Sequence, residues 1–287
     1  MITRRECLRH LTAGTGVALF GAGDVLAQPA GTYKGVMLGV QSYSFRDREL
    51  DDAIAGMRQV GLTSCELWQG HLEPKRVERD VMRKWRETTP LSEFQAIRAK
   101  FEKAGIRIYA YNISFKDDFS DAEIERGFEF AKALGTDIIT DSANTNVVKR
   151  VVPVAVRRRM IVAMHNHSRI DPNEFATPDD FTRAMNLSPQ IAVNLDIGHF
   201  TAANFDAAAF LREHHRRIVT LHIKDRKRND GPNMPLGEGD SPIGPVLRLL
   251  RDQKWAIPAN IEYEYKGGDT VEEVRRCLEF CRRALDA

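Results

Sequence analysis

The feature that most constrains the fold is a repeated alternation of short β-branched or aromatic runs with longer amphipathic stretches, which begins near Gly35. The short runs are predicted strands, at Val36–Tyr43, Thr63–Trp68, Ile106–Ile113, Asp137–Thr140, Ile161–His165, Ile191–Asp196, Ile218–His222 and Ala259–Tyr263. The longer stretches are predicted helices, at Leu50–Val60, Leu91–Ala104, Asp121–Leu134, Phe205–His215, Pro242–Gln253 and Thr270–Leu285. Alternation of this kind is typical of parallel βα proteins. Because an eight-unit barrel takes about 250 residues and the chain has 287, we predict the α/β class and a single-domain (β/α)8 TIM barrel.

The connections between these runs support the same architecture. Three glycines each follow a predicted helix and precede a predicted strand, as left-handed helix caps do: Gly61, Gly105 and Gly135. The segment Asn146–Arg159 is interpreted as the fourth helix despite its valines and Pro153, because helix propensity is only a weak constraint. Gln69–Pro90 and Arg226–Ser241 are predicted long loops. Both follow strands, so both are expected on the same face of the barrel.

Composition narrows the kind of partner. The chain has 42 lysines and arginines against 40 aspartates and glutamates, a formal net charge of +2. A net charge this small does not produce an electrostatic field that would attract nucleic acid or an anionic membrane. A hydrophobic fraction of 43% is that of a globular chain with a real core. We therefore expect a small-molecule partner and no nucleic acid.

The N-terminus differs from the rest of the chain. Thr3–Arg9 resembles the twin-arginine export consensus, and an apolar run at Leu11–Phe20 and a cleavage-like Val25–Ala27 follow it. The apolar run is shorter than the roughly 20 residues that a membrane span needs. We predict a twin-arginine signal peptide at residues 1–27, a mature barrel at residues 28–287 without an integral membrane span, and a periplasmic location. An ordinary N-terminal helix or a membrane anchor is the alternative.

Acidic residues and histidines gather where the predicted strands end. Strand ends of a barrel share one mouth, so these residues are expected to converge: Glu66, Asp141, His165, His167, Asp196, His199, His222, Asp225, Glu262 and Glu264. Taken singly, a strand-end aspartate can cap a helix and a histidine can be a hydrogen-bonded core group. Together they would bury several unpaired charges, which is costly without a counter-ion. Carboxylate and imidazole groups suit Mn, Zn, Co or Mg, so we predict a divalent-metal site.

Several strings in strand order make the chain similar to a known superfamily. They are GVQSYSFR at Gly39–Arg46, CELW at Cys65–Trp68, NLDIGHF at Asn194–Phe200, LHIKDR at Leu221–Arg226, LGEGD at Leu236–Asp240 and IEYE at Ile261–Glu264. Together they resemble the sugar isomerase/epimerase superfamily with a xylose-isomerase-like barrel, which includes tagatose epimerases, inosose dehydratases and endonuclease IV.

The resemblance implies a metal held by Asp196, His222 and Glu262. The usual fourth ligand of the superfamily is a glutamate on the fifth strand, in a string like ENH, whereas this chain has HNH at residues 165–167. His165 is then either the fourth ligand or a base. In the second case the metal would draw on Asp141 or Glu264 instead.

The resemblance also implies an activity. It is that of a metal-dependent isomerase or epimerase, which removes the proton beside the carbonyl of a keto-sugar or cyclic polyol through a metal-stabilised enediolate. The candidate bases are Glu66, His165, His167 and Glu264. The predicted substrate contacts are Lys224, Trp68 and His199, with Tyr43 and Phe200 as further pocket candidates and Asp225 as a group supporting the ligands.

Three alternatives remain open at this point. The first is a lyase or dehydratase that eliminates from a 3-keto-glycoside or an inosose, and the second is a phosphoesterase like endonuclease IV, which the near-neutral charge disfavours. The third is a catalytically inactive barrel that binds sugar. Export favours an unphosphorylated carbohydrate, and oligomerisation is left open.

Overall fold

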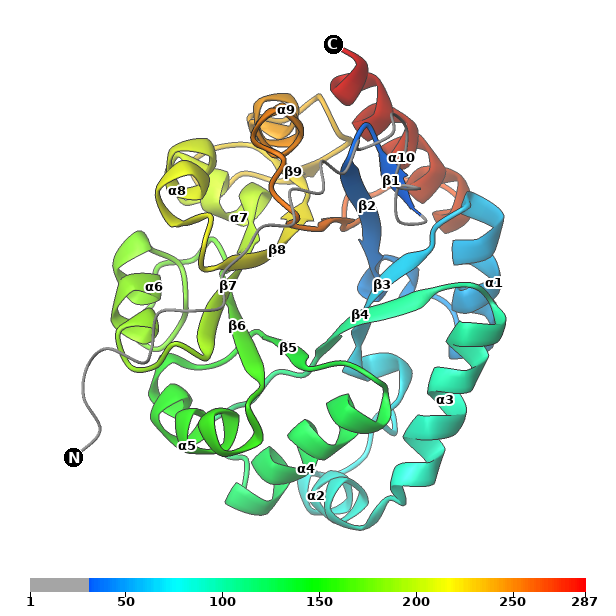
Figure 1. Ribbon diagram of the computed structural model, residues 1–287, viewed down its shortest axis with the longest axis vertical. Coiled ribbons are helices and arrows are strands. Elements are labelled where there is room, and N and C mark those ends of the chain that lie inside the picture. The colour runs from blue at the N-terminus through cyan, green and yellow to red at the C-terminus, as the bar shows by residue number, and fades with distance from the viewer. Residues whose placement is uncertain (1–30) are drawn as a thin grey trace, which may run out of the picture.

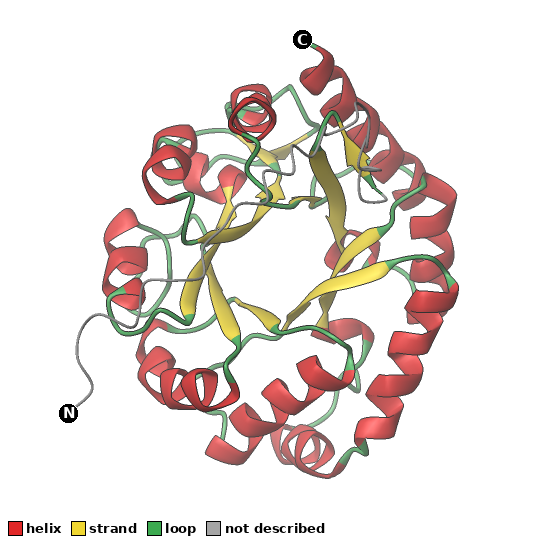
Figure 2. Cartoon of the chain, viewed as in Figure 1, coloured by secondary structure: helices red, strands yellow, loops and turns green. Residues whose placement is uncertain are grey.

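The computed structural model describes residues 31–287, so the predicted signal peptide lies outside the described residues. Eight parallel strands close into a barrel with helices around it (Figures 1 and 2), which confirms the predicted fold. The barrel strands are β2 (Val36–Gln41), β3 (Ser64–Trp68), β4 (Arg107–Asn112), β5 (Ile138–Asp141), β6 (Ile161–His165), β7 (Ile191–Asp196), β8 (Ile218–Ile223) and β11 (Ala259–Ile261). They pair in the order β2-β11-β8-β7-β6-β5-β4-β3, and β2 pairs with β3 to close the ring.

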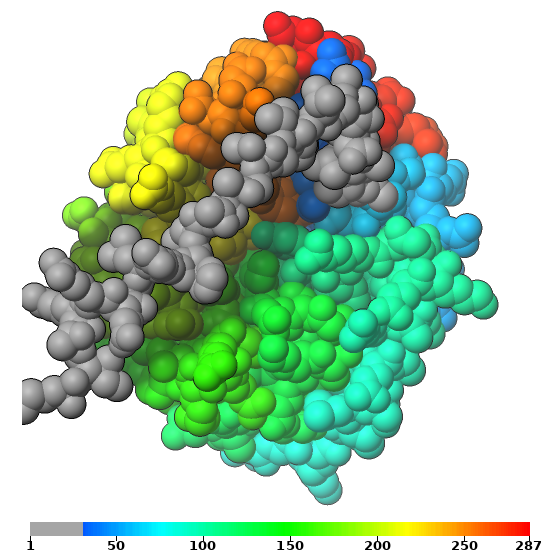
Figure 3. All heavy atoms as spheres, viewed as in Figure 1, coloured from blue at the N-terminus to red at the C-terminus, as the bar shows by residue number. Residues whose placement is uncertain are grey.

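Helices cover the outside of the ring in chain order. They are α1 (Leu50–Val60), α2 (Arg79–Thr88), α3 (Leu91–Lys103), α4 (Asp121–Ala133), α5 (Val148–Arg158), α6 (Pro178–Met185), α7 (Ile197–Ala202), α8 (Ala207–His214), α9 (Ile243–Gln253) and α10 (Thr270–Asp286). In the space-filling view the colours run around the perimeter in sequence order (Figure 3). The last helix, α10, packs against α1, so the helical layer closes as the sheet does.

Short elements complete the described chain. They are the strand β1 (Thr32–Tyr33), antiparallel to β2, the hairpin of β9 (Asp225–Arg226) and β10 (Asn233–Met234), and the 3-10 turns η1 (Ser42–Phe45), η2 (Gln69–His71) and η3 (Thr145–Val147). The hairpin lies within the predicted loop Arg226–Ser241. No helix of residues 31–287 has the length and apolar character needed to span a bilayer.

Three helical segments test the sequence interpretation. The helix α5 confirms the prediction for Asn146–Arg159, and it runs through Pro153 because three of its valines pack in the core. The predicted loop Gln69–Pro90 is wrong in part, since it contains α2. The sequence analysis also missed α6, although Thr177 and Asp180 form a capping box with Pro178 at the first turn.

The helix α2 escaped detection because ion pairs rather than an apolar face attach it. Its inward residue Arg86 is buried and makes two hydrogen bonds to the carboxylate of Glu73, at 2.7 and 2.9 Å. Arg86 also donates to Glu123 of α4 at 3.1 Å. A polar stretch held in this way has no 3.6-residue apolar period from which it could be predicted.

The core fills the space between the barrel and its helices. Aromatic pairs contribute to it, such as Phe94 of α3 stacked on Phe130 of α4 with centroids 3.9 Å apart. Phe200, a pocket candidate from the sequence, is fully buried and packs near Phe181 and Phe210 instead. The cysteines of residues 31–287 are all free and buried.

The predicted glycine caps are confirmed, because Gly61, Gly105 and Gly135 all have positive φ angles. Gly61 caps α1 at φ 87°, and a Cβ built there would meet no atom within 4 Å. We therefore expect Gly61→Ala to destabilise the fold by about 1 kcal/mol through backbone strain alone. Urea unfolding measures this, with Gly268→Ala as the control because Gly268 does not have a positive φ. Equal stability of the two variants would contradict the prediction.

Candidate metal and substrate site

A cavity of about 350 Å³ opens at the carboxyl ends of the barrel strands. The residues predicted for the site that line it are Trp68, His165, His167, His199, His222, Lys224, Glu262 and Glu264. The rest of its wall is formed by Gln41, Tyr43, Asn112, Ser114, Lys116 and Ser142. Residues from one end of the chain to the other thus meet in one place, as the barrel topology requires.

Asp196 is positioned by the way β7 ends. It is the last residue of the strand and the N-cap of α7, and its Oδ1 accepts the backbone N–H of His199 at 2.7 Å. Its backbone is bound on both sides by the buried amide of Asn166, which accepts from the N–H and donates to the carbonyl oxygen. The strand register places Asp196 opposite His222. One carboxylate oxygen is therefore fixed by the cap, and Oδ2 is left for another partner.

Three of the predicted ligands converge. Asp196, His222 and Glu262 each offer a ligand atom, and these atoms lie within 4.8 Å of one another. All three side chains are buried, and Asp196 Oδ2, His222 Nδ1 and Glu262 Oε2 form ion pairs with one another and with Lys224 that do not have hydrogen-bond geometry. Buried polar atoms without hydrogen bonds are costly. Burial alone would lower the pKa of His222, but Glu66 and Glu262 raise it well above its usual range. Two carboxylates and an imidazole that gives up its proton are what a divalent cation binds, so the residues present fit such an ion.

His165 stands where it could serve as the fourth ligand. It forms a second group of potential ligands with Asp196 and His199, and its own Nδ1 is buried without a hydrogen bond to a described residue. Burial, together with the nearby His222 ring, lowers the pKa of His165 well below its usual range. A neutral imidazole keeps a lone pair, which both a ligand and a base require.

Asp141, the other candidate for the fourth ligand, lies apart from this group. Its Oδ1 accepts the backbone N–H of Phe115 at 2.9 Å, and it does not line the cavity. Burial raises the pKa of Asp141 well above its usual range. The placement favours a role in holding the loop after β4 rather than a metal.

Lys224 does not lie where a free substrate contact would. It is 2% exposed, and its Nζ is 3.2 Å from Asp196 Oδ2, 2.7 Å from Glu262 Oε2 and 2.5 Å from Glu264 Oε2. Its ammonium faces these carboxylates, so the predicted contact between Lys224 and a substrate is not available in this arrangement. Lys224 can therefore bind substrate only if another cation takes its place at these carboxylates.

The charges of this cluster perturb one another strongly. Burial would raise the pKa of Asp196, but the Lys224 ammonium and the His199 ring outweigh burial and hold the pKa well below its usual range. Burial would also raise the pKa of Glu262, but Lys224 and His222 outweigh it and lower this pKa to about 2. Both carboxylates are therefore ionised at neutral pH, as cation ligands must be.

Glu66 lies beneath the cavity rather than in it. It is fully buried, does not line the cavity, and receives hydrogen bonds from five side chains: Gln41, Thr140, Asn194, His222 and Asn260. His222 Nε2 lies 3.0 Å from both oxygens of Glu66. A carboxylate surrounded in this way has no access to a substrate, which does not fit the predicted role of base. The contact with Nε2 instead leaves Nδ1 of His222 to face Asp196 and Glu262.

His199 is oriented by a residue that the sequence analysis did not select. The guanidinium of Arg226 donates to His199 Nδ1 at 2.7 Å, and because arginine only donates, Nδ1 is the acceptor and Nε2 carries the hydrogen. Burial and the neighbouring Lys224 lower the pKa of His199 to about 3, so the ring is neutral. The result is a ring that lines the cavity with an N–H donor.

His167 is paired with a carboxylate. Its Nδ1 lies 3.3 Å from Glu174 Oε2, and its side chain is 40% exposed. Because the carboxylate accepts the hydrogen on Nδ1, the basic lone pair of a neutral His167 is on Nε2. Glu174 lies several residues beyond the end of a predicted strand, so its position in the sequence did not indicate that it would reach the site.

Asp225 supports a loop rather than the ligands, whereas Trp68 lies on the cavity wall. Asp225, expected behind the metal ligands, instead accepts the backbone N–H groups of Gly237, Gly239 and Ser241. It thereby anchors the loop that carries LGEGD. Trp68 lines the cavity as predicted and makes an edge contact with Tyr43, with centroids 4.9 Å apart.

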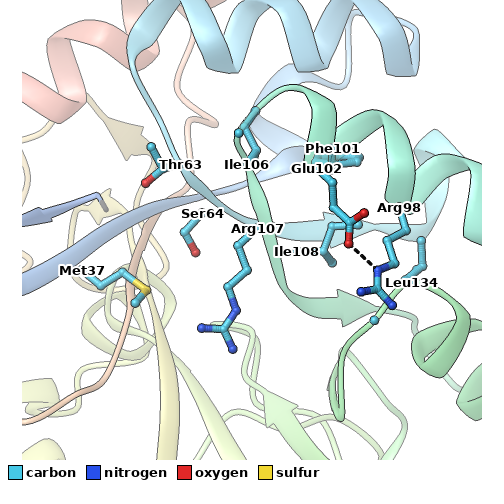
Figure 4. A pocket seen from close by; sticks show the side chains of 12 residues that line it. Met37, Thr63, Ser64, Arg98, Phe101, Glu102, Ile106, Arg107, Ile108 and Leu134 are labelled. Atoms are coloured by element: carbon cyan, nitrogen blue, oxygen red, sulfur yellow. Dashed lines mark hydrogen bonds and ion pairs between the residues drawn. The ribbon is translucent and has the colours of Figure 1, made fainter. Parts of the chain in front are cut away.

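A separate cavity of about 530 Å³ lies at the opposite end of the barrel (Figure 4). It is lined from the amino-terminal ends of β2 to β4 by residues such as Met37, Ser64 and Arg107. None of the predicted site residues lines it. Since barrel enzymes use the carboxyl ends of their strands, the smaller cavity is the candidate active site.

The fold and this arrangement define a barrel with a polar, cation-compatible site at the carboxyl ends of its strands. A family model described as xylose isomerase-like TIM barrel matches residues 54–284. The chain belongs to this family, which confirms the fold and superfamily inferred from the sequence.

Individual relatives are distant. The chain is 25% identical over 202 residues to L-ribulose-5-phosphate 3-epimerase UlaE of Escherichia coli O17:K52:H18, strain UMN026, covering 68% of this chain and 67% of that protein. Among solved structures it is similar to the E. coli 3-keto-D-glucoside 4-epimerase YcjR, with a TM-score of 0.65 and 15% identity over 86% of this chain and 99% of that chain. It is also similar to the probable 3-DHS dehydratase AsbF of Bacillus anthracis. The TM-score is 0.62 and the identity 15%, over 85% of this chain and 98% of that chain. These two structural similarities concern the fold.

Proposed function

We propose that this protein is a divalent-cation-dependent sugar isomerase or epimerase that removes the proton beside the carbonyl of an unphosphorylated keto-sugar. One observation carries the proposal. Asp196, His222 and Glu262 bring together ligand atoms that have ion pairs but no hydrogen bonds, beside a cavity that His222 and Glu262 line, and His167, which is paired with Glu174, lines the same cavity. The activities of the epimerases among its relatives support the same reaction class.

The cation would be held by Asp196, His222 and Glu262, with His165 as the fourth ligand. When bound, a divalent ion of the Mn, Zn, Co or Mg type acts as a Lewis acid that polarises a carbonyl and makes the neighbouring C–H group more acidic. His165 occupies the position of the superfamily's glutamate. The ligand set would therefore contain two carboxylates and two imidazoles, and His222, whose pKa Glu66 and Glu262 raise, would lose its proton as the cation binds.

His167 is the proposed base. Its Nε2 lone pair accepts the proton from the carbon beside the carbonyl, while Glu174 stabilises the imidazolium that forms. Arg226 occupies Nδ1 of His199, so Nε2 carries the hydrogen that His199 would donate to a substrate oxygen once Lys224, now 3.0 Å from Nε2, has moved away. The His167 imidazolium then holds the proton that can return to carbon, because Glu264, the other candidate at the cavity wall, is paired with the Lys224 ammonium at 2.5 Å.

The cavity wall favours a neutral sugar over a sugar phosphate. The two lysines that line the cavity are both engaged, Lys224 by carboxylates and Lys116 by the backbone oxygen of Ser142 at 2.5 Å. Trp68 and Tyr43 add an aromatic wall, against which the C–H face of a sugar packs. An unphosphorylated substrate also agrees with the proposed periplasmic location, which rests on the N-terminal sequence.

Hydrogen exchange tests this proposal. The protein, loaded with Mn²⁺, is incubated in D₂O with keto-pentoses, keto-hexoses and 3-keto-glucosides, each with and without a phosphate where available. We expect deuterium to enter the carbon beside the carbonyl of an unphosphorylated substrate, and treatment with a chelator to stop it. Mass spectrometry and NMR of the product then separate epimerisation, isomerisation and loss of a β-substituent, the last being the lyase alternative. Absence of exchange with every substrate would favour a sugar-binding barrel without activity.

A further inference from the structure

Lys224 occupies an unusual place among the site's charges. Its Nζ forms ion pairs with three carboxylates, and two of them use the oxygens that face His222 Nδ1, namely Asp196 Oδ2 at 3.2 Å and Glu262 Oε2 at 2.7 Å. A cation that neutralises buried carboxylates is a strong stabilising contact, since each carboxylate alone would be costly in the interior. The chain therefore carries an internal counter-ion within its own candidate metal site.

A dication would draw on the same two oxygens. An ammonium and a divalent ion that share ligand oxygens stand close together, and like charges at such separations repel strongly in a buried setting. Neither can keep its full set of contacts while the other is present. Binding of the dication is therefore coupled to movement of Lys224.

Two further contacts of Lys224 bear on such a movement. Its Nζ lies 3.0 Å from His199 Nε2, but a neutral imidazole has one acceptor nitrogen, and Arg226 already donates to Nδ1 of that ring at 2.7 Å. The contact with Nε2 is therefore not a satisfied hydrogen bond. Glu264, in contrast, is 22% exposed at the cavity and lies 2.5 Å from Nζ, so it can retain the ammonium after the other contacts are lost.

We propose that Lys224 competes with the divalent cation for Asp196 and Glu262, and that cation binding moves its ammonium to Glu264 at the cavity wall. The same side chain then has two positions, as a counter-ion of the ligands and as a group available to substrate oxygens. This inference rests on the proposed cation site but not on the proposed reaction.

Calorimetric titration with Mn²⁺ tests the competition. The metal is first removed from the full-length protein with a chelator, and wild type, Lys224→Met and Lys116→Met are titrated. We expect Lys224→Met to bind Mn²⁺ at least about tenfold more tightly, because the ion no longer displaces an ammonium. Lys116→Met should stay within about twofold of wild type, since Lys116 lines the same cavity but its ammonium donates to the backbone oxygen of Ser142 and forms no ion pair with Asp196 or Glu262. This control distinguishes direct competition for the ligands from the general electrostatic effect of removing one positive charge near the cavity.

Thermal unfolding supplies a second readout on the same variants. Without metal, Lys224→Met should unfold at a lower temperature than wild type, because two buried carboxylates lose their counter-ion, and Mn²⁺ should stabilise it more than it stabilises wild type. Equal or weaker Mn²⁺ binding by Lys224→Met would overturn the proposal. Absence of Mn²⁺ binding by every protein would overturn it together with the cation site.

A crystal structure of the wild type with Mn²⁺ tests the movement without any variant, and so remains decisive if Lys224→Met does not fold. We expect Nζ to lie beyond hydrogen-bonding distance of Asp196 Oδ2 while it stays near Glu264. An ion bound to Asp196 and Glu262 with both Lys224 contacts retained would overturn the proposal. Failure of the deuterium exchange test alone, with these results intact, would count against the reaction and not against the competition.

Discussion

Replacing Asp196 with asparagine is expected to weaken Mn²⁺ binding by more than about 100-fold, because loss of a supporting group behind a ligand already costs 10- to 100-fold. Deuterium exchange into a substrate should slow by about a thousandfold. The fold should persist, since the asparagine oxygen can still cap α7 through the backbone N–H of His199. What changes is Oδ2, which becomes an amide that donates hydrogen atoms toward the other ligands. Calorimetry and exchange measured on the same preparation check both effects.

The control for this variant is Asp206→Asn. Asp206 caps α8 by accepting the backbone N–H of Ala209 at 2.9 Å, so the chemical change and the local structure are the same while the metal ligands are untouched. Neither Mn²⁺ affinity nor exchange should change. If Asp196→Asn bound Mn²⁺ as tightly as the control does, Asp196 would not be a ligand.

The parts of the fold that could be predicted are those with a period in the sequence. Barrel strands are buried on both faces, so they are short apolar runs, and the capping glycines such as Gly61 mark where each helix stops. The helix α2 could not be found in this way, because Arg86 attaches it through Glu73 and Glu123. Ion pairs between residues far apart in sequence leave no periodic pattern.

The parts of the site that could be predicted are those at strand ends. Barrel topology brings strand ends together, whatever their separation in the chain, and the resemblance to the superfamily then indicated Asp196, His222 and Glu262 as the ligands among them. Alternation also indicates which residues face inward, and it could have selected Asn194 and Asn260, each two positions before a predicted ligand. Depth along the barrel axis is not encoded in this alternation.

Depth and loop geometry account for the remaining differences. Glu66 faces inward as expected but lies one layer below the cavity, among amide and hydroxyl donors. Arg226 and Glu174 come from loops, where neither period nor strand order fixes the direction of a side chain. Lys224 was predicted to contact substrate, yet its partners are Asp196, Glu262 and Glu264, at distances that only the folded chain defines.

Glu66→Gln is expected to reveal a positioning role through cation affinity. The amide would turn an NH₂ group toward donors that now share a carboxylate, including Asn194 and Asn260. Unpaired buried donors cost about 1–3 kcal/mol each, so we expect a loss of about 3 kcal/mol in the free energy of unfolding. We also expect Mn²⁺ affinity to fall by about 10- to 100-fold, as when a carboxylate behind a ligand histidine is removed, because His222 Nε2 loses the charged acceptor that orients the ring.

Glu73→Gln separates this effect from general destabilisation. Glu73 is also a buried carboxylate, but its two oxygens accept from Arg86 at 2.7 and 2.9 Å, and it does not line the candidate site. Breaking that pair should cost about 3 kcal/mol of stability and leave Mn²⁺ affinity unchanged at a temperature where both variants are folded. Equal losses of affinity in the two variants would mean that affinity follows stability alone. A loss confined to Glu66→Gln would instead trace the affinity to the contact between this carboxylate and His222, because that contact is what Glu73 lacks.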